Sequence, residues 1–119
     1  MKGKSILKEK SYVFAIRIAN LSKYLKEEKS EHIMSKQLLR SGTAVGALIR
    51  EAKNAESTAD FIHKLAIAQK ECDETIYWLE LLKDTKYITT VEFDSINFNA
   101  IELLKMLRST IITTKKNHN

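Results

Sequence analysis

The sequence predicts an all-α protein: an antiparallel up-down-up-down four-helix bundle that spans residues 1–119 as a single domain. Three observations predict this fold class. The chain contains no proline and only three glycines, so little in it interrupts a helix. Apolar residues recur at the spacing of one helical face in four segments. Short polar links separate these segments, which favours antiparallel neighbours.

The first two helices are expected over residues 9–27 and 31–54. The apolar stripe of the first consists of Phe14, Ile18, Leu21 and Leu25. The stripe of the second consists of Met34, Leu38, Val45, Ile49 and Ala52. The polar run KEEKSE, residues 26–31, marks the turn between them, and Ser30 is the expected N-cap of the second helix.

The third and fourth helices are expected over residues 58–84 and 90–115. Ser57 followed by Asp60 resembles a capping box and opens the third helix. Its apolar stripe consists of Phe61, Leu65, Ala68, Cys72, Ile76 and Leu79. Thr89 or Thr90 is the expected cap of the fourth helix. The stripe of that helix consists of Ile96 or Asn97, Ala100 or Ile101, Leu104, Leu107 and Ile111. The tail KKNHN, residues 115–119, is expected to fray.

Two glycines four residues apart, Gly42 and Gly46, lie inside the second helix. A phosphate-binding Walker loop needs G-x-x-x-x-G-K-[ST] after a strand, and this stretch has neither the spacing nor the strand. Each glycine costs a helix interior about 1 kcal/mol relative to alanine. Small residues four apart let another backbone approach closely, so we expect close helix packing at both positions. The neighbour is a helix of the same bundle or of a second subunit.

The formal net charge of +5 is unevenly distributed along the chain. Residues 57–85 carry three Lys against six Asp or Glu, whereas each of the segments 1–28, 29–56 and 86–119 has an excess of Lys and Arg. One interpretation is that basic and acidic helices pair inside the bundle. The other is that the excess positive charge binds a polyanion such as RNA or DNA.

A basic face on the second helix is the candidate nucleic-acid interface. Lys36, Arg40 and Arg50 share this face, with the small side chains of Thr43 and Ala47 between them. The alternative is that Arg40 and Arg50 pair with acids of the third helix, among them Asp60, Glu71 and Glu74. The full set of candidate nucleic-acid-binding residues is Lys36, Arg40, Arg50, Lys53, Arg17 and Lys23.

We predict no catalytic residues, no cofactor and no metal site. Glu56, Asp60 and His63 share a helix face, but a di-iron bundle needs a second acid-x-x-His pair on another helix. Cys72, the single cysteine, falls on an apolar stripe and has no positioned histidine. A lone cysteine fits a reducing compartment, and no apolar run approaches the ~20 residues that span a bilayer. These features predict a cytoplasmic protein without membrane contact.

The order of these features resembles the four-helix-bundle family of 23S ribosomal RNA intervening-sequence proteins. The residues that carry the resemblance are SYVFAIRIANLSKYL (11–25), SKQLLRSGTAVGALIREA (35–52), ESTADFIHKLAIAQKECDETIYWLELL (56–82) and the closing amphipathic helix. The family pattern usually has Ser at the position of Ala44 and Asn at the position of Leu48. Both departures remove a polar group from the second helix.

The resemblance implies a bundle that assembles as a ring, typically a homopentamer, without established catalytic residues. A similar fold is the accessory protein of diversity-generating retroelements, a basic pentamer that binds nucleic acid and the reverse transcriptase. Two functions follow as expectations. The first is a non-enzymatic oligomer that binds structured RNA. The second is an interaction scaffold or accessory subunit for a nucleic-acid enzyme such as a reverse transcriptase.

Overall fold

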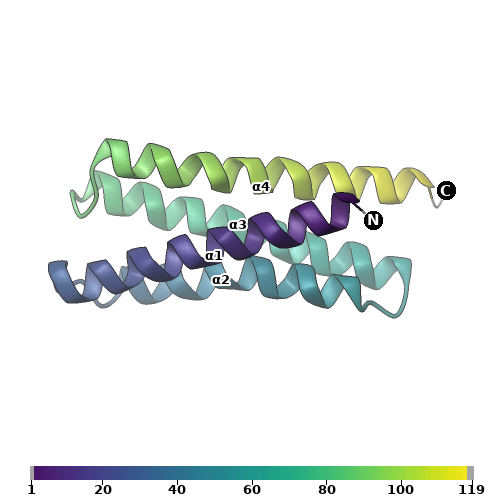
Figure 1. Ribbon diagram of the computed structural model, residues 1–119, viewed down its shortest axis with the longest axis horizontal. Helices are drawn as coiled ribbons and strands as arrows, with labels where there is room; N and C mark the ends of the chain where they lie inside the picture. The colour runs from purple at the N-terminus through teal and green to yellow at the C-terminus, as the bar shows by residue number, and fades with distance from the viewer. Residues whose placement is uncertain (1, 118–119) are drawn as a thin grey trace.

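The computed structural model describes residues 2–117, with the side chains of residues 6–117, and contains only helices within that range. The four helices are α1 (Lys2–Lys29), α2 (Met34–Lys53), α3 (Thr58–Asp84) and α4 (Thr90–Asn117). Together they form an antiparallel four-helix bundle of about 49 × 22 × 20 Å (Figure 1). Helix α3 has the predicted bounds. Helix α1 begins seven residues earlier than predicted, and α4 stays helical through Asn117.

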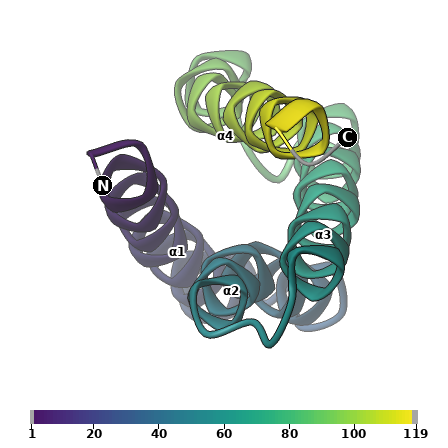
Figure 2. The same ribbon diagram turned by 90° about the vertical axis from the view of Figure 1, so that its right-hand side faces the viewer.

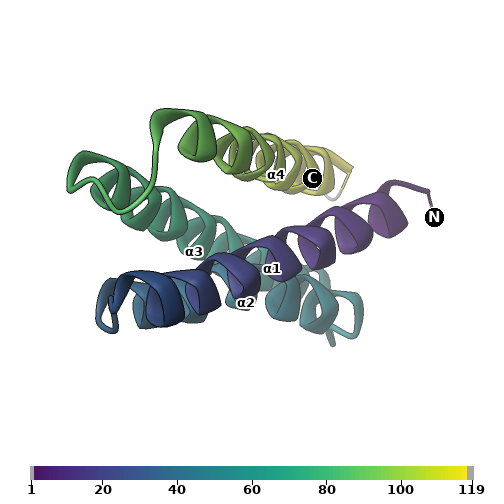
Figure 3. The same cartoon turned by 60° about the vertical axis from the view of Figure 1, so that its left-hand side comes forward.

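The helices follow one another around the bundle, so that α1 and α4 become neighbours (Figure 2). Of the four neighbouring pairs, α1 and α4 make the least extensive contact. Helix α1 also crosses α2 obliquely (Figure 3). Two surface grooves of about 480 and 490 Å³ lie along the α1–α4 contact.

The topology brings four chain segments to one end of the bundle. The start of α1, the end of α2, the start of α3 and the end of α4 lie together there, at the right of Figure 1. The α1–α2 and α3–α4 connections lie at the opposite end. Residues 8, 53 and 115, which are far apart in sequence, are therefore close to the same end of the molecule.

Most residues of the predicted apolar stripes form the core, but Met34, Phe61 and Ile76 are only partly buried. Phe14, Ile18 and Leu25 of α1 are buried, whereas Leu21 is only partly buried. On α4 the buried positions are Ile96 and Ala100, the first choice in each of the two predicted pairs. Core residues outside the predicted stripes are Leu7, Leu82, Ile88, Phe93 and Leu103. Leu48, one of the two departures from the family pattern, packs against this core, and Ala44 is half-buried.

The predicted cap of α2 is wrong, and the helix begins at Met34 rather than at residue 31. Ser30 has a φ of 53°, which places it in the tight turn before the helix. Glu31 is the residue that satisfies the free backbone N–H groups. Its carboxylate accepts hydrogen bonds from Ile33, Met34 and Ser35 at 3.3, 3.1 and 2.7 Å. Burial alone raises the pKa of Glu31, but these backbone hydrogen bonds outweigh it and lower the pKa.

The starts of α3 and α4 carry the predicted caps. The Ser57 hydroxyl accepts a hydrogen bond from the backbone N–H of Asp60 at 3.0 Å, and the Asp60 carboxylate accepts one from Glu56. At α4, Thr89 and Glu92 form a reciprocal capping box, with N–H to oxygen distances of 2.7 and 3.1 Å.

Both glycines of α2 face α1. A Cβ atom on Gly42 would lie 2.6 Å from Cγ2 of Ile18, which is closer than two non-bonded carbon atoms approach each other. A Cβ atom on Gly46 would lie 3.4 Å from the backbone oxygen of Ser11, an ordinary contact. The α1–α2 contact within one subunit therefore requires glycine at position 42 but not at position 46.

Candidate nucleic-acid interface

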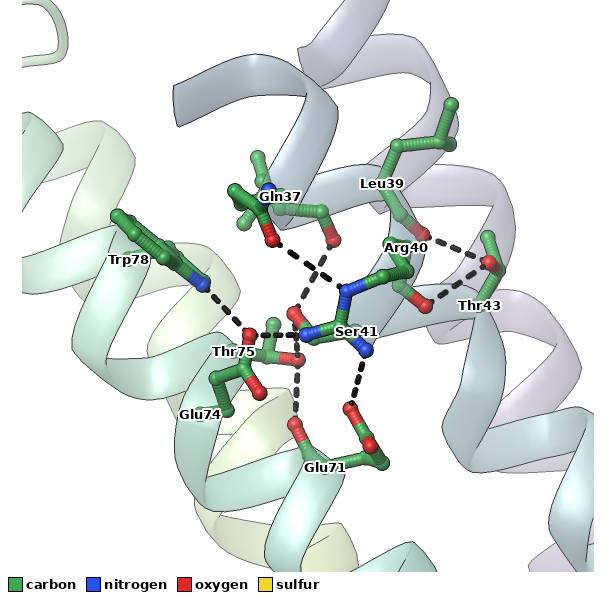
Figure 4. Close-up of polar contacts among 10 residues, drawn as sticks. Gln37, Leu39, Arg40, Ser41, Thr43, Glu71, Glu74, Thr75 and Trp78 are labelled. Atoms are coloured by element: carbon green, nitrogen blue, oxygen red, sulfur yellow. Dashed lines mark hydrogen bonds and ion pairs between the residues drawn. The ribbon is translucent and has the colours of Figure 1, made fainter. Parts of the chain in front are cut away.

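Arg40 faces α3 and is held there by two carboxylates (Figure 4). One guanidinium nitrogen, Nη1, lies 3.1 Å from Glu71, and the other, Nη2, makes a close ion pair with Glu74. The indole N–H of Trp78 also donates to Glu74, at 2.9 Å. The Trp78 and Arg40 hydrogen bonds lower the pKa of Glu74, and the Glu74 contact raises the pKa of Arg40. Of the two interpretations of Arg40, internal pairing is the one that the geometry supports.

Beneath this ion pair, two buried hydroxyl groups join α2 to α3. The hydroxyls of Ser41 and Thr75 lie 2.9 Å apart, and Thr75 also bonds to the backbone oxygen of Glu71 at 2.8 Å (Figure 4). Both side chains are fully buried, so these bonds satisfy groups that water does not reach. This part of α2 therefore serves the helix packing of the subunit.

Arg17 is also occupied within the subunit, because it bridges α1 and α4. Its guanidinium donates to the backbone oxygen and the hydroxyl of Ser95, at 3.2 and 3.0 Å, and to the side-chain oxygen of Asn99 at 2.6 Å. These contacts lie between the two grooves of the α1–α4 contact. Arg17 is therefore a tether between helices whose direct contact is small.

Lys23 and Lys36 are exposed, and neither is within ion-pair distance of a carboxylate in residues 6–117. Lys23 belongs to the second half of α1, and Lys36 to the first turn of α2. Both lie in the half of the bundle that contains most of the acidic residues. The structure separates them from Arg50 and Lys53, which lie near the opposite end.

Arg50 and Lys53 form a cationic cluster with Lys8 of α1. All three side chains line one pocket, together with Leu7 and Ile49. The guanidinium carbon of Arg50 lies 5.3 Å from the ring centre of Tyr12, a cation–π contact that orients the side chain. No carboxylate of the described side chains lies within ion-pair distance of any of the three cations. We call Lys8, Arg50 and Lys53 the basic cluster.

The basic cluster belongs to a half of the bundle that is net positive. The contacts of Ser11 with Gly46 and of Cys72 with Ala100 mark the middle of the bundle. The half with residues 6–14, 45–71 and 101–117 carries ten Lys or Arg and six Asp or Glu. The other half, residues 15–44 and 72–100, carries eight and nine. Two of these ten cations, Lys115 and Lys116, lie in the last turn of α4.

The candidate residues predicted from the sequence omit Lys8 and the cations of α4. They include Arg17 and Arg40, although the structure ties both arginines to neighbouring helices. The missing signal is topological. The basic start of α1 lies beside the basic end of α2 because these two helices run antiparallel. A count of charges along the sequence shows each segment but not their meeting.

The described residues contain no group of three or more His, Cys, Asp or Glu side chains that could hold a metal ion. Asp60 of the Glu56–Asp60–His63 face caps α3 instead. Cys72 is fully buried and donates to the backbone oxygen of Ala100 at 3.3 Å. Burial raises its pKa to about 12, so the thiol stays protonated at neutral pH. Within the described part of the chain, no helix is long and apolar enough to cross a membrane.

Comparison with known proteins agrees with the geometry of the bundle. Residues 4–109 match the 23S rRNA-intervening sequence proteins. The chain belongs to that family. The chain is similar to a protein of unknown function of the S23 ribosomal protein family from Bacteroides thetaiotaomicron, known from a crystal structure. The two are 55% identical, with a TM-score of 0.91, over 92% of this chain and 97% of the other. No curated protein matches the chain. The family resemblance seen in the sequence is thus confirmed.

Proposed function

We propose that this protein is a non-enzymatic oligomer that binds nucleic acid, structured RNA first, through the positive half of the bundle. The observation that carries the proposal is the basic cluster. Lys8, Arg50 and Lys53 lie together without a carboxylate partner among the described side chains. Cations that no acid neutralises are free to replace the counterions of a phosphate backbone. The family name supports RNA as the first nucleic acid to test.

Exposed apolar side chains support self-association, and the family resemblance implies a homopentameric ring. Val13 of α1 and Val91 of α4 line the grooves of the α1–α4 contact and are 57% and 79% exposed. Phe98, two helical turns beyond Val91, is 70% exposed. Large apolar groups gathered on one face favour burial against another surface. A ring would also repeat the basic cluster in every subunit, which strengthens binding to a long polyanion.

The test compares RNA binding by matched charge variants at several salt concentrations. In the Arg50→Gln/Lys53→Gln variant, we expect weaker binding and a shallower slope of log K against log salt, by about one for each phosphate that the variant no longer neutralises. Lys23→Gln/Lys36→Gln removes the same charge from the opposite half and should change the slope much less. A ribosomal RNA fragment and a DNA of equal length serve as ligands, and native mass spectrometry gives the subunit number.

Two outcomes contradict the proposal. If both double variants lose affinity equally, the binding follows net charge and not the basic cluster. If the wild type gives no salt-sensitive binding at low salt, the nucleic-acid function is wrong. A cytoplasmic location follows from the proposed ligand and is tested by fractionation of the source cells.

A further inference from the structure

The pocket beneath the basic cluster has a cationic rim, but its floor is apolar. Leu7 of α1, Ile49 of α2 and Leu65 of α3 line it. Thr110 of α4 also lines it, but its hydroxyl donates to the backbone oxygen of Met106 at 2.8 Å and is occupied. All four helices thus contribute to one cavity, whose rim is cationic and whose floor offers no free hydrogen-bonding side chain among these four residues.

The size and lining of the pocket limit what can enter it. Its volume is about 40 Å³, which is room for about three groups of the size of a water molecule. That volume suits the branched end of a leucine or isoleucine side chain. A nucleobase would bring hydrogen-bonding edges that this floor leaves without partners, at a cost in free energy. A lipid acyl chain needs a longer channel.

The cations at the rim of the pocket determine which groups can flank an aliphatic side chain that enters it. The cations of Lys8, Arg50 and Lys53 have no carboxylate partner among the described side chains, so acidic groups beside the inserted side chain would be attracted to all three. We propose that this pocket docks an acidic segment of a partner protein, with one branched aliphatic residue inserted between flanking Asp or Glu residues. The floor supplies the apolar contact, and the rim supplies the charge complementarity.

This interaction rests on the proposed function to the extent that it uses the same three cations that we assign to RNA. Acidic peptide and RNA therefore compete for the basic cluster, but only the peptide uses the floor of the pocket. Because only the peptide uses the floor, substitutions can distinguish peptide binding from RNA binding. A substitution that fills the pocket without changing its charge affects peptide binding alone.

The experiment measures fluorescence anisotropy of a labelled peptide with one leucine flanked on both sides by glutamates. The protein should bind this peptide at least about tenfold more tightly than the same peptide with serine in place of leucine. Thr110→Leu places a side chain in the pocket and should weaken peptide binding about tenfold, to the level of the serine peptide. Thr113→Leu is the matched control, because Thr113 is exposed on the same helix and does not line the pocket.

RNA binding by the same variants distinguishes this proposal from the proposed function. Thr110→Leu should leave RNA affinity unchanged, whereas Arg50→Gln/Lys53→Gln should weaken both ligands. Equal binding of the leucine and serine peptides overturns the docking proposal even if RNA binds as expected. Loss of RNA affinity in Thr110→Leu, with the melting temperature unchanged, overturns it by assigning the pocket to a nucleobase. If Thr110→Leu abolishes self-association, the docking proposal is also overturned, because the pocket then binds a second copy of the chain.

Discussion

At Gly42 the surface of α2 meets Ile18 of α1 so closely that no other residue fits without movement. The Cβ atom of an alanine would lie 2.6 and 2.8 Å from two side-chain carbons of Ile18, whose side chain is fully buried and cannot turn away. At Gly46 the nearest atom is the Ser11 backbone oxygen, 3.4 Å away. Two glycines on one helix face thus have different physical requirements, because Gly42 packs against the side chain of Ile18 and Gly46 against the backbone of Ser11.

Alanine substitutions at these two positions should have opposite effects on stability. Gly42→Ala gains about 1 kcal/mol of helix propensity but forces Ile18 out of place, which costs about 1–3 kcal/mol. We expect a net loss of stability. Gly46→Ala keeps the gain without the overlap and should stabilise the protein by up to about 1 kcal/mol. Urea denaturation of the two variants measures both changes in stability, and equal effects would contradict the tight contact of Gly42 with Ile18.

Arg40 and Arg50, predicted to share one face of α2, face different neighbours in the structure, α3 and α1. Arg40 lies opposite Glu71 and Glu74 of α3 and pairs with both. Arg50, further along α2, lies over the Tyr12 ring of α1 and has no such pair among the described side chains. Their spacing along the sequence is compatible with either use. The acids that reach Arg40 are placed by the packing of α3 against α2.

At the scale of the element, the start of α2 depends on Glu31, a side chain outside the helix. The sequence favoured Ser30 because serine is a common N-cap. The chain reverses at that residue with a positive φ, so the next acidic side chain reaches the N–H groups instead. The caps at Ser57 and Thr89 were predictable because both sit directly before a regular helix. Sequence preferences for N-cap residues fail at a tight turn, because the path of the chain decides which side chain reaches the helix end.

The Glu31 cap should make stability depend on pH. Its folded-state pKa is below the ordinary value of 4.5, so its contribution is complete above that value and is lost as pH falls through the lower folded-state pKa. Glu31→Gln keeps the shape but weakens the cap by about 1 kcal/mol at neutral pH. The measurement is urea denaturation of both proteins from pH 7 to pH 3. The difference between them should shrink on acidification, and a constant difference would contradict the role of the carboxylate.

The same element scale explains why α1 and α4 hold exposed apolar groups. Their mutual contact is the least extensive in the bundle, and Arg17 bridges it by hydrogen bonds rather than by apolar packing. Val13 and Phe98 therefore remain largely exposed in the subunit. An exposed phenylalanine contributes little to the stability of the subunit that carries it.

For the whole molecule, this leads to a prediction about assembly. Phe98→Glu should reduce the mass of the oligomer in native mass spectrometry, because a charge replaces an apolar group on the proposed contact face. The helical content and the denaturant midpoint of the subunit should change little, since Phe98 is 70% exposed. Lys70→Gln on α3 is the control, because it lowers the net charge by the same amount at an exposed position away from this face. An unchanged mass for Phe98→Glu would exclude this face from the subunit contact.

The distribution of charge is also a property of the whole molecule. The ten Lys and Arg residues of the positive half come from all four helices, and the basic cluster joins Lys8 of α1 to Arg50 and Lys53 of α2. The opposite half contains the acidic end of α3, with Glu80 and Asp84. A polyanion that approaches the molecule therefore meets a polarised surface, attractive at one end and weakly repulsive at the other.

By itself, the sequence determined the four helices, most of their core-facing residues and the family, since apolar periodicity, caps and the absence of proline act over a few residues. Only the tertiary structure decided which cations share a surface. It tied Arg40 and Arg17 to neighbouring helices, moved the α2 cap to Glu31 and brought Lys8 beside Lys53. The physical reason is that charges interact through space, and the distance between residues far apart in sequence is set by how the helices pack.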